Sequence, residues 1–364
     1  MHFLFFSILL KFHFYRFADV IFVCFLLMLL LFVFTIAYAV NKKRSRRNKE
    51  LWYADITTII SQAIFSTNKE DDPVDISYRI EMLLHNKGFR NTLINELIHA
   101  KKNLSGSSTL NLVKLYEVLQ LDKNSLTKLH SSKWHIKAKG IQELAMLDQK
   151  KYVKEIFRLT NNPNVLVRNE AQCALISFYG YQGLRFLNVA SYPISQWQQI
   201  QLLNKLGYEV PKNFESVKNW LQSSNESVKI FALKLATVFN CYEVYENVIN
   251  CLQIDSLQVR LNALEYLKKL PHVDTADNLI ANYFFKSKIY KLAVIVALKD
   301  TGSEKQIPFL LKQLHDNDND IKAAAARSLT GLHPSGVSFL QNHLFADENP
   351  WKAIFLHIKN ERAA

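Results

Sequence analysis

The longest apolar stretch of the chain lies near its N-terminus. Residues 20–40 read VIFVCFLLMLLLFVFTIAYAV and contain no charged side chain. A helix of this length rises about 1.5 Å per residue, which matches the roughly 30 Å hydrocarbon core of a bilayer. The pattern therefore predicts one transmembrane helix over residues 18–40.

The flanks of this stretch predict its orientation. The basic segment that follows is expected to stay on the cytoplasmic side of the membrane. Its cations are Lys42, Lys43, Arg44, Arg46, Arg47 and Lys49. We expect the N-terminus outside, residues 1–17 as an interfacial segment, residues 41–50 as a basic juxtamembrane linker, and the remaining chain in the cytoplasm. The alternative is a secreted or periplasmic product after signal cleavage near Ala39, but the apolar core of a signal peptide usually has only about 7–15 residues.

A second pattern recurs about every 31 residues, in which a branched apolar or aromatic residue precedes a cation. It occurs at Ile136-Lys137, Val167-Arg168, Val228-Lys229, Val259-Arg260, Tyr290-Lys291 and Ile321-Lys322. Continuing the count gives a weaker copy at Trp197-Gln198 and another at Trp351-Lys352. Four residues after the first member stand Gly140, Ala171, Gln201, Ala232, Ala263, Val294 and Ala325. Small residues at one fixed helical position predict the close approach of a neighbouring helix.

Inside each repeat, apolar residues recur with the period of an amphipathic helix. Two such segments flank a polar turn, as in IPFLLKQL, HDNDND and IKAAAARSLTGL. No segment shows the sustained alternation of a strand. The pattern predicts an all-α fold, with about seven to eight helix–turn–helix repeats over residues 121–364. Residues 51–120 also have helical periodicity without the clean spacing, and we interpret them as an N-terminal cap of the repeats or, alternatively, as a separate small helical domain.

The polar turn, the V-R/K step and the A-x-x-x-L spacing resemble HEAT repeats, as in Val259-Arg260, Ala263 and Leu267. The resemblance covers about residues 120–360. It implies a right-handed α-solenoid of antiparallel helix pairs, with the second helices lining the concave face, and it implies no activity. In that family the cation often reaches acidic groups in adjacent turns. The position is held here by Arg168, Arg260, Lys291 and Lys322, which we expect to be structural.

Composition narrows the class of protein further. Gly and Pro supply 9 and 8 of the 364 residues, well below their usual combined share of about 12%, which disfavours turn-rich sandwiches and barrels. Four cysteines are too few for a disulfide scaffold in a chain of this length. The net charge of +13 is uneven, because residues 1–49 carry eight Lys or Arg against Asp19 alone.

Candidate chemistry is sparse in this sequence. Asp316, Asp318 and Asp320 suggest a calcium loop, but an EF-hand loop needs Gly and Glu where this chain has Ile321 and Arg327. We interpret the aspartates as the turn that caps the next helix. The sequence has no glycine-rich phosphate loop, no C-x-x-C pair and no H-E-x-x-H motif. We therefore expect no metal and no cofactor.

These patterns favour a non-catalytic, membrane-anchored scaffold that binds a protein partner through its second helices. The residues expected on that surface are Glu170, Phe231, Lys234, Glu265, Tyr266 and Arg327. Phe231 is the leading apolar anchor, unless it turns inward and packs between repeats. Mixed charges on this surface argue against nucleic-acid binding. The alternatives are a nucleic-acid or anionic-lipid binding module, or an enzyme, since some HEAT-like proteins are DNA glycosylases or bilin lyases.

Overall fold

The computed structural model describes residues 2–65, 76–207, 213–284, 287–332, 340 and 351–363. These residues form helices and the turns between them, and no strand occurs among them. The predicted all-α class is therefore confirmed. The chain divides into two compact units, unit 1 with residues 1–127 and unit 2 with residues 128–364. Each unit is described by itself.

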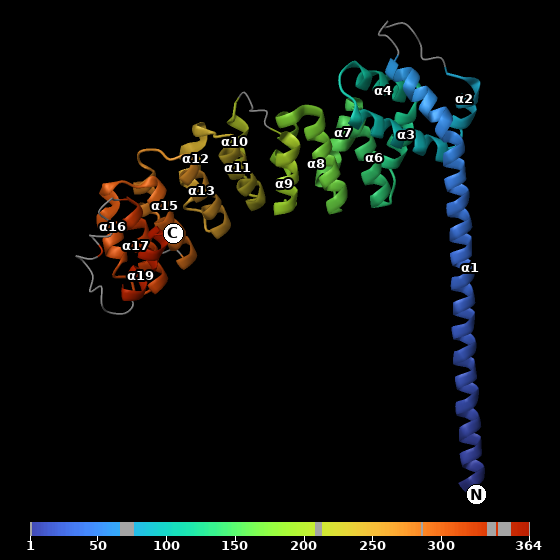
Figure 1. Ribbon diagram of the computed structural model, residues 1–364, viewed down its shortest axis with the longest axis horizontal. Coiled ribbons are helices and arrows are strands. Elements are labelled where there is room, and N and C mark those ends of the chain that lie inside the picture. The colour runs from blue at the N-terminus through green and yellow to red at the C-terminus, as the bar shows by residue number, and fades with distance from the viewer. Residues whose placement is uncertain are drawn as a thin grey trace. The chain divides into compact units, whose positions relative to one another are not determined.

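Unit 1 contains α1, a single helix that runs from His2 to Phe65 (Figure 1). The side chains of residues 21–40 are exposed along its apolar stretch. The helix then continues through residues 41–50 without interruption. The expected juxtamembrane linker is therefore a helical segment, because nothing in KKRSRRNK breaks a helix: it contains neither Gly nor Pro.

The last turns of α1 belong to the core of unit 1. The other helices of the unit are α2 (Tyr78–Leu84), α3 (Lys87–Asn103), α4 (Ser107–Val118) and most of α5 (Leu121–Leu129). Ile56, Ile59 and Ala63 are buried where α1 packs against α3 and α4. The Trp52 ring meets Phe89 edge-on at 5.8 Å between centroids. One helix therefore connects the apolar stretch directly to a folded core.

Unit 2 begins with the C-terminal end of α5 and continues as helix pairs, each with a shorter first helix and a longer second helix. The second helices are α6 (Trp134–Met146), α8 (Val165–Tyr179), α9 (Gln196–Leu206), α11 (Glu226–Val238), α13 (Leu257–Lys269), α15 (Lys288–Thr301) and α17 (Asn319–Leu332). The first helices that pack on α8 to α17 are α7 (Val153–Arg158), the 3-10 helix η3 (Gly180–Val189), α10 (Glu215–Leu221), α12 (Tyr245–Cys251), α14 (Thr275–Ala281) and α16 (Ile307–Gln313). Three short 3-10 turns, η1 (Lys150–Tyr152), η4 (Tyr242–Val244) and η5 (Glu304–Gln306), lead into α7, α12 and α16, η2 (Leu159–Asn161) follows α7, and α19 covers Trp351–Ala363. Consecutive second helices contact each other, as α11, α13, α15 and α17 do (Figure 1).

The predicted spacing marks the buried side of the second helices. Its first positions are buried at Val167, Val228, Val259, Tyr290 and Ile321, and half-buried at Ile136 and Trp351. The positions four residues later are buried as well, at Gly140, Ala171, Leu202, Ala232, Ala263, Val294 and Ala325. One assignment was wrong by a residue: Trp197 is 68% exposed, whereas Gln198 is 3% exposed. The small residue expected at Gln201 is therefore the larger Leu202.

The cation that follows the first repeat position makes contacts that differ from the expected ones. The Arg168 guanidinium donates to the backbone oxygens of Asn162 and Pro163 at 2.6 and 3.2 Å. Arg260 donates in the same way to Ile254 and Asp255, at 2.7 and 3.0 Å. Both side chains thus hold the turn of their own helix pair, and neither of these bonds goes to an acidic group of an adjacent turn.

The other two cations expected in that series make different contacts. Lys291 lies over the Tyr283 ring at 5.4 Å, and Lys322 donates to Asn319 Oδ1 at 3.4 Å. Unit 1 repeats the arginine contact, since Arg90 donates to the backbone oxygens of Leu84 and His85 at 2.5 and 3.2 Å. The pair α2–α3 therefore uses the same turn contact as the pairs α7–α8 and α12–α13 of unit 2.

Candidate interaction surface

Four of the six predicted surface residues reach solvent on the second helices. Glu170 and Lys234 are half-buried, and Glu265 and Arg327 are exposed. Glu265 lies 3.5 Å from Lys268 on the same helix. These four side chains come from α8, α11, α13 and α17, so they are distributed along unit 2 rather than gathered into one pocket.

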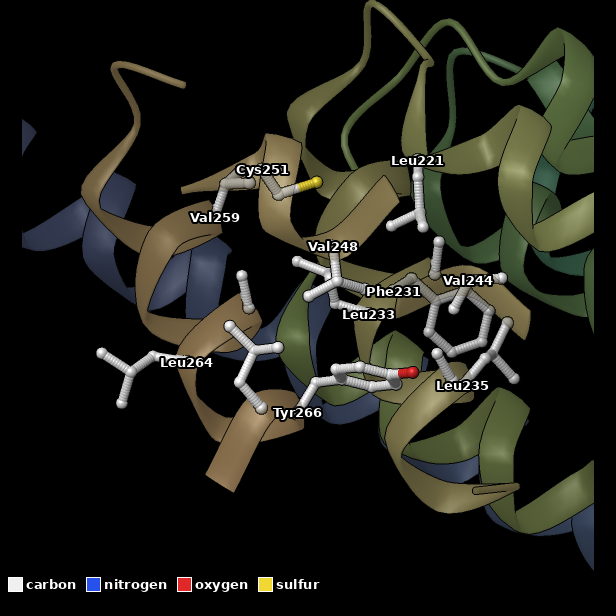
Figure 2. Close-up of a cluster of buried hydrophobic side chains, with 14 of the residues drawn as sticks. Leu221, Phe231, Leu233, Leu235, Val244, Val248, Cys251, Val259, Leu264 and Tyr266 are labelled. Atoms are coloured by element: carbon white, nitrogen blue, oxygen red, sulfur yellow. The ribbon is translucent and has the colours of Figure 1, made fainter. Parts of the chain in front are cut away.

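Phe231 and Tyr266 were wrongly assigned to this surface, because both are fully buried. Residues three, four and seven positions apart share one face of a helix. Phe231 therefore lies on the same face as Val228, and its ring packs among buried side chains near Leu235 and Val244 (Figure 2). Phe231 packs inward, which was the alternative interpretation.

Tyr266 shares the buried face of α13 with Val259 and Ala263. Its hydroxyl donates to the backbone oxygen of Cys241 at 2.6 Å, so the polar end of the ring is satisfied inside the core. Burial raises the pKa of this phenol above its usual range. Tyr266 therefore joins neighbouring helix pairs and offers nothing to a partner.

A polar cluster, half-buried except for the exposed Lys205, lies where α8 and α9 meet. Its members are Asn169, Glu170 and Cys173 from α8 and Gln201 and Lys205 from α9. Asn169 donates to Gln201 Oε1 at 2.9 Å. Burial raises the pKa of Glu170, and Lys205 partly opposes that rise. Burial, with a contribution from Glu170, raises the pKa of Cys173 to about 11, so this thiol stays protonated at neutral pH and is a poor nucleophile.

Lys234 extends these polar contacts onto α11. Its ammonium group donates to Gln199 Oε1 at 2.9 Å. Burial lowers the pKa of Lys234. The cluster and Lys234 can therefore supply hydrogen bonds and two cations, Lys205 and Lys234, to a ligand at this part of the second-helix surface.

The sequence interpretation missed a row of exposed apolar side chains at the N-terminal ends of α6, α8 and α9. The row consists of Trp134, Val165, Leu166, Trp197 and Ile200, with exposures of 47–68%. These helices are neighbours, since α6 packs on α8 and α8 packs on α9. The signal was present as large apolar residues just before the buried repeat position, but Trp197 was aligned as the first position of its own repeat.

The aspartate-rich turn at residues 316–320 behaves as a helix cap. Asp316 Oδ1 accepts from the amide of Asp318, and Asp318 Oδ1 accepts from the amide of Asp320, both at 2.8 Å. Lys288 Nζ lies 2.6 and 2.7 Å from the carboxylates of Asp318 and Asp320. Hydrogen bonding to this lysine lowers the pKa of Asp318. Within the residues that the structure describes, no group of three or more His, Cys, Asp or Glu side chains is arranged to hold a metal.

The basic segment of α1 is available to solvent. The side chains of Lys42, Lys43, Arg44, Arg46 and Arg47 are exposed, whereas that of Lys49 lies outside the described part of the chain. Arg46 Nε lies 3.3 Å from Glu50 one turn later. Such an exposed pair contributes little to stability, and most of the positive charge faces solvent.

No protein-family model matches the chain, and no curated protein matches it. Among solved structures, human deoxyhypusine hydroxylase in complex with glycerol is 11% identical over 78% of this chain and 98% of its own, with a TM-score of 0.31. One engineered protein is 12% identical over 83% of this chain and 87% of its own, with a TM-score of 0.33. Another is 13% identical over 78% and 97%, with a TM-score of 0.23. At these scores, the likenesses give no information about activity or partners.

Proposed function

We propose that this chain is a non-catalytic scaffold, anchored in a membrane by α1, which binds a protein partner on a HEAT-like α-solenoid. The observation that carries the proposal is the continuity of α1 from its uncharged, exposed stretch into the buried core of unit 1. Because residues 51–65 pack in that core, an uncut α1 holds the apolar stretch directly on the folded part of unit 1.

The membrane part of the proposal rests on length and charge. α1 is the one helix of the described residues that is long and apolar enough to cross a bilayer. A signal sequence can have the same apolar character. The cations that follow Val40 support a cytoplasmic location for the C-terminal side of the apolar stretch. The helix through residues 41–50 supports a stiff connection of about 15 Å between the bilayer and the core of unit 1.

The solenoid part rests on contacts that recur between neighbouring helix pairs. Ser328 donates to the backbone oxygen of Ile295 at 2.7 Å, across 33 residues. The Tyr283 hydroxyl donates to Gln313 at 3.0 Å, across 30 residues. Contacts at this interval, together with the buried positions of the repeat, are what stacked helical repeats require. A stacked array presents a long surface of second helices, which suits a polypeptide better than a small molecule.

Membrane topology is tested on the full-length chain. We expect the protein to remain in membranes after an alkaline carbonate wash, and a C-terminal reporter that works only in the cytoplasm to be active. Recovery of a soluble product that begins near Val40, outside the cytoplasm, would contradict the anchor.

The scaffold role is tested by crosslinking in intact cells followed by mass spectrometry. We expect a defined protein partner whose crosslinks map to the second helices of unit 2. Turnover by the purified chain that depends on a metal or nucleotide, or tight salt-sensitive DNA binding without a protein partner, would favour an enzyme or a nucleic-acid binder instead.

A further inference from the structure

The apolar row on α6, α8 and α9 has no cover in the part of the chain that the structure describes. Trp197 is 68% exposed and Trp134 is 47% exposed, although both have large apolar rings. Axes of packed helices lie about 8–10 Å apart. The row therefore spans about 20 Å, the length of about six residues of an extended peptide. Large contiguous apolar patches on a soluble surface commonly mark interaction sites.

The three sequence segments that hold this row carry cations and no acidic residue, and Glu170 follows directly after the second of them. Segments 130–139, 161–169 and 190–200, which hold the row and its turns, contain no Asp or Glu. Their cations are Lys133, Lys137, Lys139 and Arg168. Lys133 is exposed and Lys137 is half-buried, so both reach solvent, while Arg168 is buried.

The equivalent turns of later helix pairs differ from one another in charge. The three aspartates of residues 316–320 make the turn before α17 acidic. Glu226 and Asp255 are each followed by a cation within five residues, and the sequence at the start of α15 has Lys286 and Lys288 without an acidic residue. An acidic partner would therefore meet like charges at the turn before α17, whereas the segments that hold the apolar row offer it cations.

From these features we propose that the row binds an acidic peptide segment of a partner protein, in which Asp or Glu residues are interleaved with large apolar side chains. The proposal rests on the scaffold function above and specifies the chemistry of its partner. The apolar side chains of the peptide would cover Trp134, Leu166 and Trp197, and its carboxylates would lie beside Lys133 and Lys137. Tryptophans in such a position are common anchors of binding energy.

Neighbouring polar groups favour a polypeptide over an anionic lipid surface. The half-buried amides of Asn169 and Gln201 adjoin the row on α8 and α9 and are hydrogen-bonded to each other at 2.9 Å. Glu170 lies in the same cluster. Amides can exchange hydrogen bonds with a peptide backbone, which a lipid headgroup surface does not offer.

The test uses the full-length chain in phosphatidylcholine nanodiscs. The probe is a fluorescein-labelled 14-residue amphipathic peptide with Glu at every polar position and Leu or Trp at every apolar position, and its counterpart has Lys in place of Glu. We expect fluorescence anisotropy to show binding of the Glu peptide alone. Trp134→Ser and Trp197→Ser should each weaken that binding about tenfold. Tyr242→Ser, at a side chain that is 64% exposed in η4, is the matched control and should leave binding unchanged.

Charge reversal gives an independent result. The double variant Lys133→Glu/Lys137→Glu should weaken binding of the Glu peptide about tenfold and allow the Lys peptide to bind. Equal binding of both peptides to the wild type, no binding of the Glu peptide, or unchanged binding by Trp197→Ser would overturn the inference. Phosphatidylserine vesicles captured in a Trp197-dependent way, without peptide binding, would assign the row to lipid and would also overturn it. If cell crosslinks still mapped to second helices in these cases, the scaffold function would stand and only this site would fail.

Discussion

Two junctions between second helices differ in chemistry although they occupy equivalent places in the repeat. Between α11 and α13 the equivalent positions are Val228, Ala232, Val259 and Ala263, and all four are buried. Between α8 and α9 the position is taken by Gln198, which is also buried. Its amide donates to Gln172 Oε1 at 2.8 Å, and Gln172 donates to the backbone oxygen of Thr160 at 3.1 Å.

At the α8–α9 junction a glutamine also replaces the arginine that holds the turn in other helix pairs. Gln199 donates to the backbone oxygen of Ile194 at 3.1 Å, where Arg260 makes the corresponding contacts in the α12–α13 pair. The preceding element is the 3-10 helix η3 instead of an α-helix. The comparison shows that the spacing of buried positions is kept while their chemistry changes, provided that each buried polar group finds a partner.

The largest effect is expected from a charge in the apolar junction. Ala263→Glu introduces a carboxylate and extra volume at a position with no exposed surface. An unpaired buried charge and overpacking together should cost more than about 4 kcal/mol. Because repeats stabilise their neighbours, protease sensitivity should spread to adjacent helix pairs.

Urea unfolding and limited proteolysis measure this change. Glu265→Ala, on the exposed side of the same helix, is the control and should unfold like the wild type. Wild-type stability in Ala263→Glu would mean that the positions of the repeat have been assigned incorrectly.

Removal of the Phe231 side chain tests the core of the same junction. Phe231→Ala should lower the free energy of unfolding by about 3–5 kcal/mol, as expected for a fully buried ring. Trp197→Ala removes a larger but exposed side chain and should cost less than about 1 kcal/mol. The melting temperatures of the two variants distinguish a core from a surface residue. A larger loss in Trp197→Ala than in Phe231→Ala would contradict the assignment of Phe231 to the core and Trp197 to the surface.

The close approach of η3 to α8 predicts a smaller loss. A Cβ atom added at Gly183 would lie 2.3 Å from the backbone oxygen of Leu175, so the backbone itself must move. Gly183→Ala should therefore lower the free energy of unfolding by about 2–3 kcal/mol. A Cβ at Gly331 meets only the Lys299 side chain, which can move aside, so Gly331→Ala should have little effect. Equal thermal stability of the two variants would exclude tight packing at Gly183.

The two buried glutamine side chains of the α8–α9 junction should contribute unequally to the free energy of unfolding. Gln172→Met leaves Thr160 O and the Gln198 amide without their partner and should cost about 1–2 kcal/mol. Gln198→Met also removes an oxygen, Gln198 Oε1, that has no hydrogen-bond partner among the described residues. These two effects oppose each other, so Gln198→Met should change stability by less than about 1 kcal/mol. Chemical denaturation measures both, and a larger loss in Gln198→Met would refute the assigned network.

The smallest effect is a change in pH dependence at Glu170. Its pKa is raised in the fold, so the neutral form is favoured there. The resulting stabilisation is complete below the unfolded pKa and is lost as pH rises through the folded pKa. Glu170→Gln should therefore be more stable than the wild type at pH 7 and show a flatter pH profile. Glu265→Gln, which is exposed, should keep the wild-type profile, and identical profiles for both variants would disprove burial of Glu170.

Much of this fold could be predicted because helical periodicity and the interval of about 31 residues report directly on which positions are buried. The all-α class and the small residues at Ala232, Ala263 and Ala325 follow from that interval. Successive residues of a helix are 100° apart, so an error of one residue exchanges core for surface. Aligning the repeat on Trp197 was such an error, because the buried residue is Gln198.

The surface was harder to predict than the core. Whether a residue three positions after the repeat position is buried depends on what covers it, which is why Glu170 is half-buried and Phe231 is fully buried. Contacts such as that of Gly183 with Leu175 join segments whose approach leaves no periodic trace in the sequence. The apolar row was overlooked for the same reason, since its exposure depends on the absence of a neighbouring cover.

Position-specific photocrosslinking in intact cells tests the central claim, a protein partner on the second helices of a membrane-anchored chain, most directly. Benzoylphenylalanine is placed in the full-length protein at Lys234 or Arg327 on second helices, or at Tyr242 in η4 as the control. We expect a discrete higher-mass adduct that contains a second protein at Lys234 and Arg327, in the membrane fraction, and none at Tyr242. Adducts at Tyr242 alone, or no protein adduct at any of the three positions, would contradict the account.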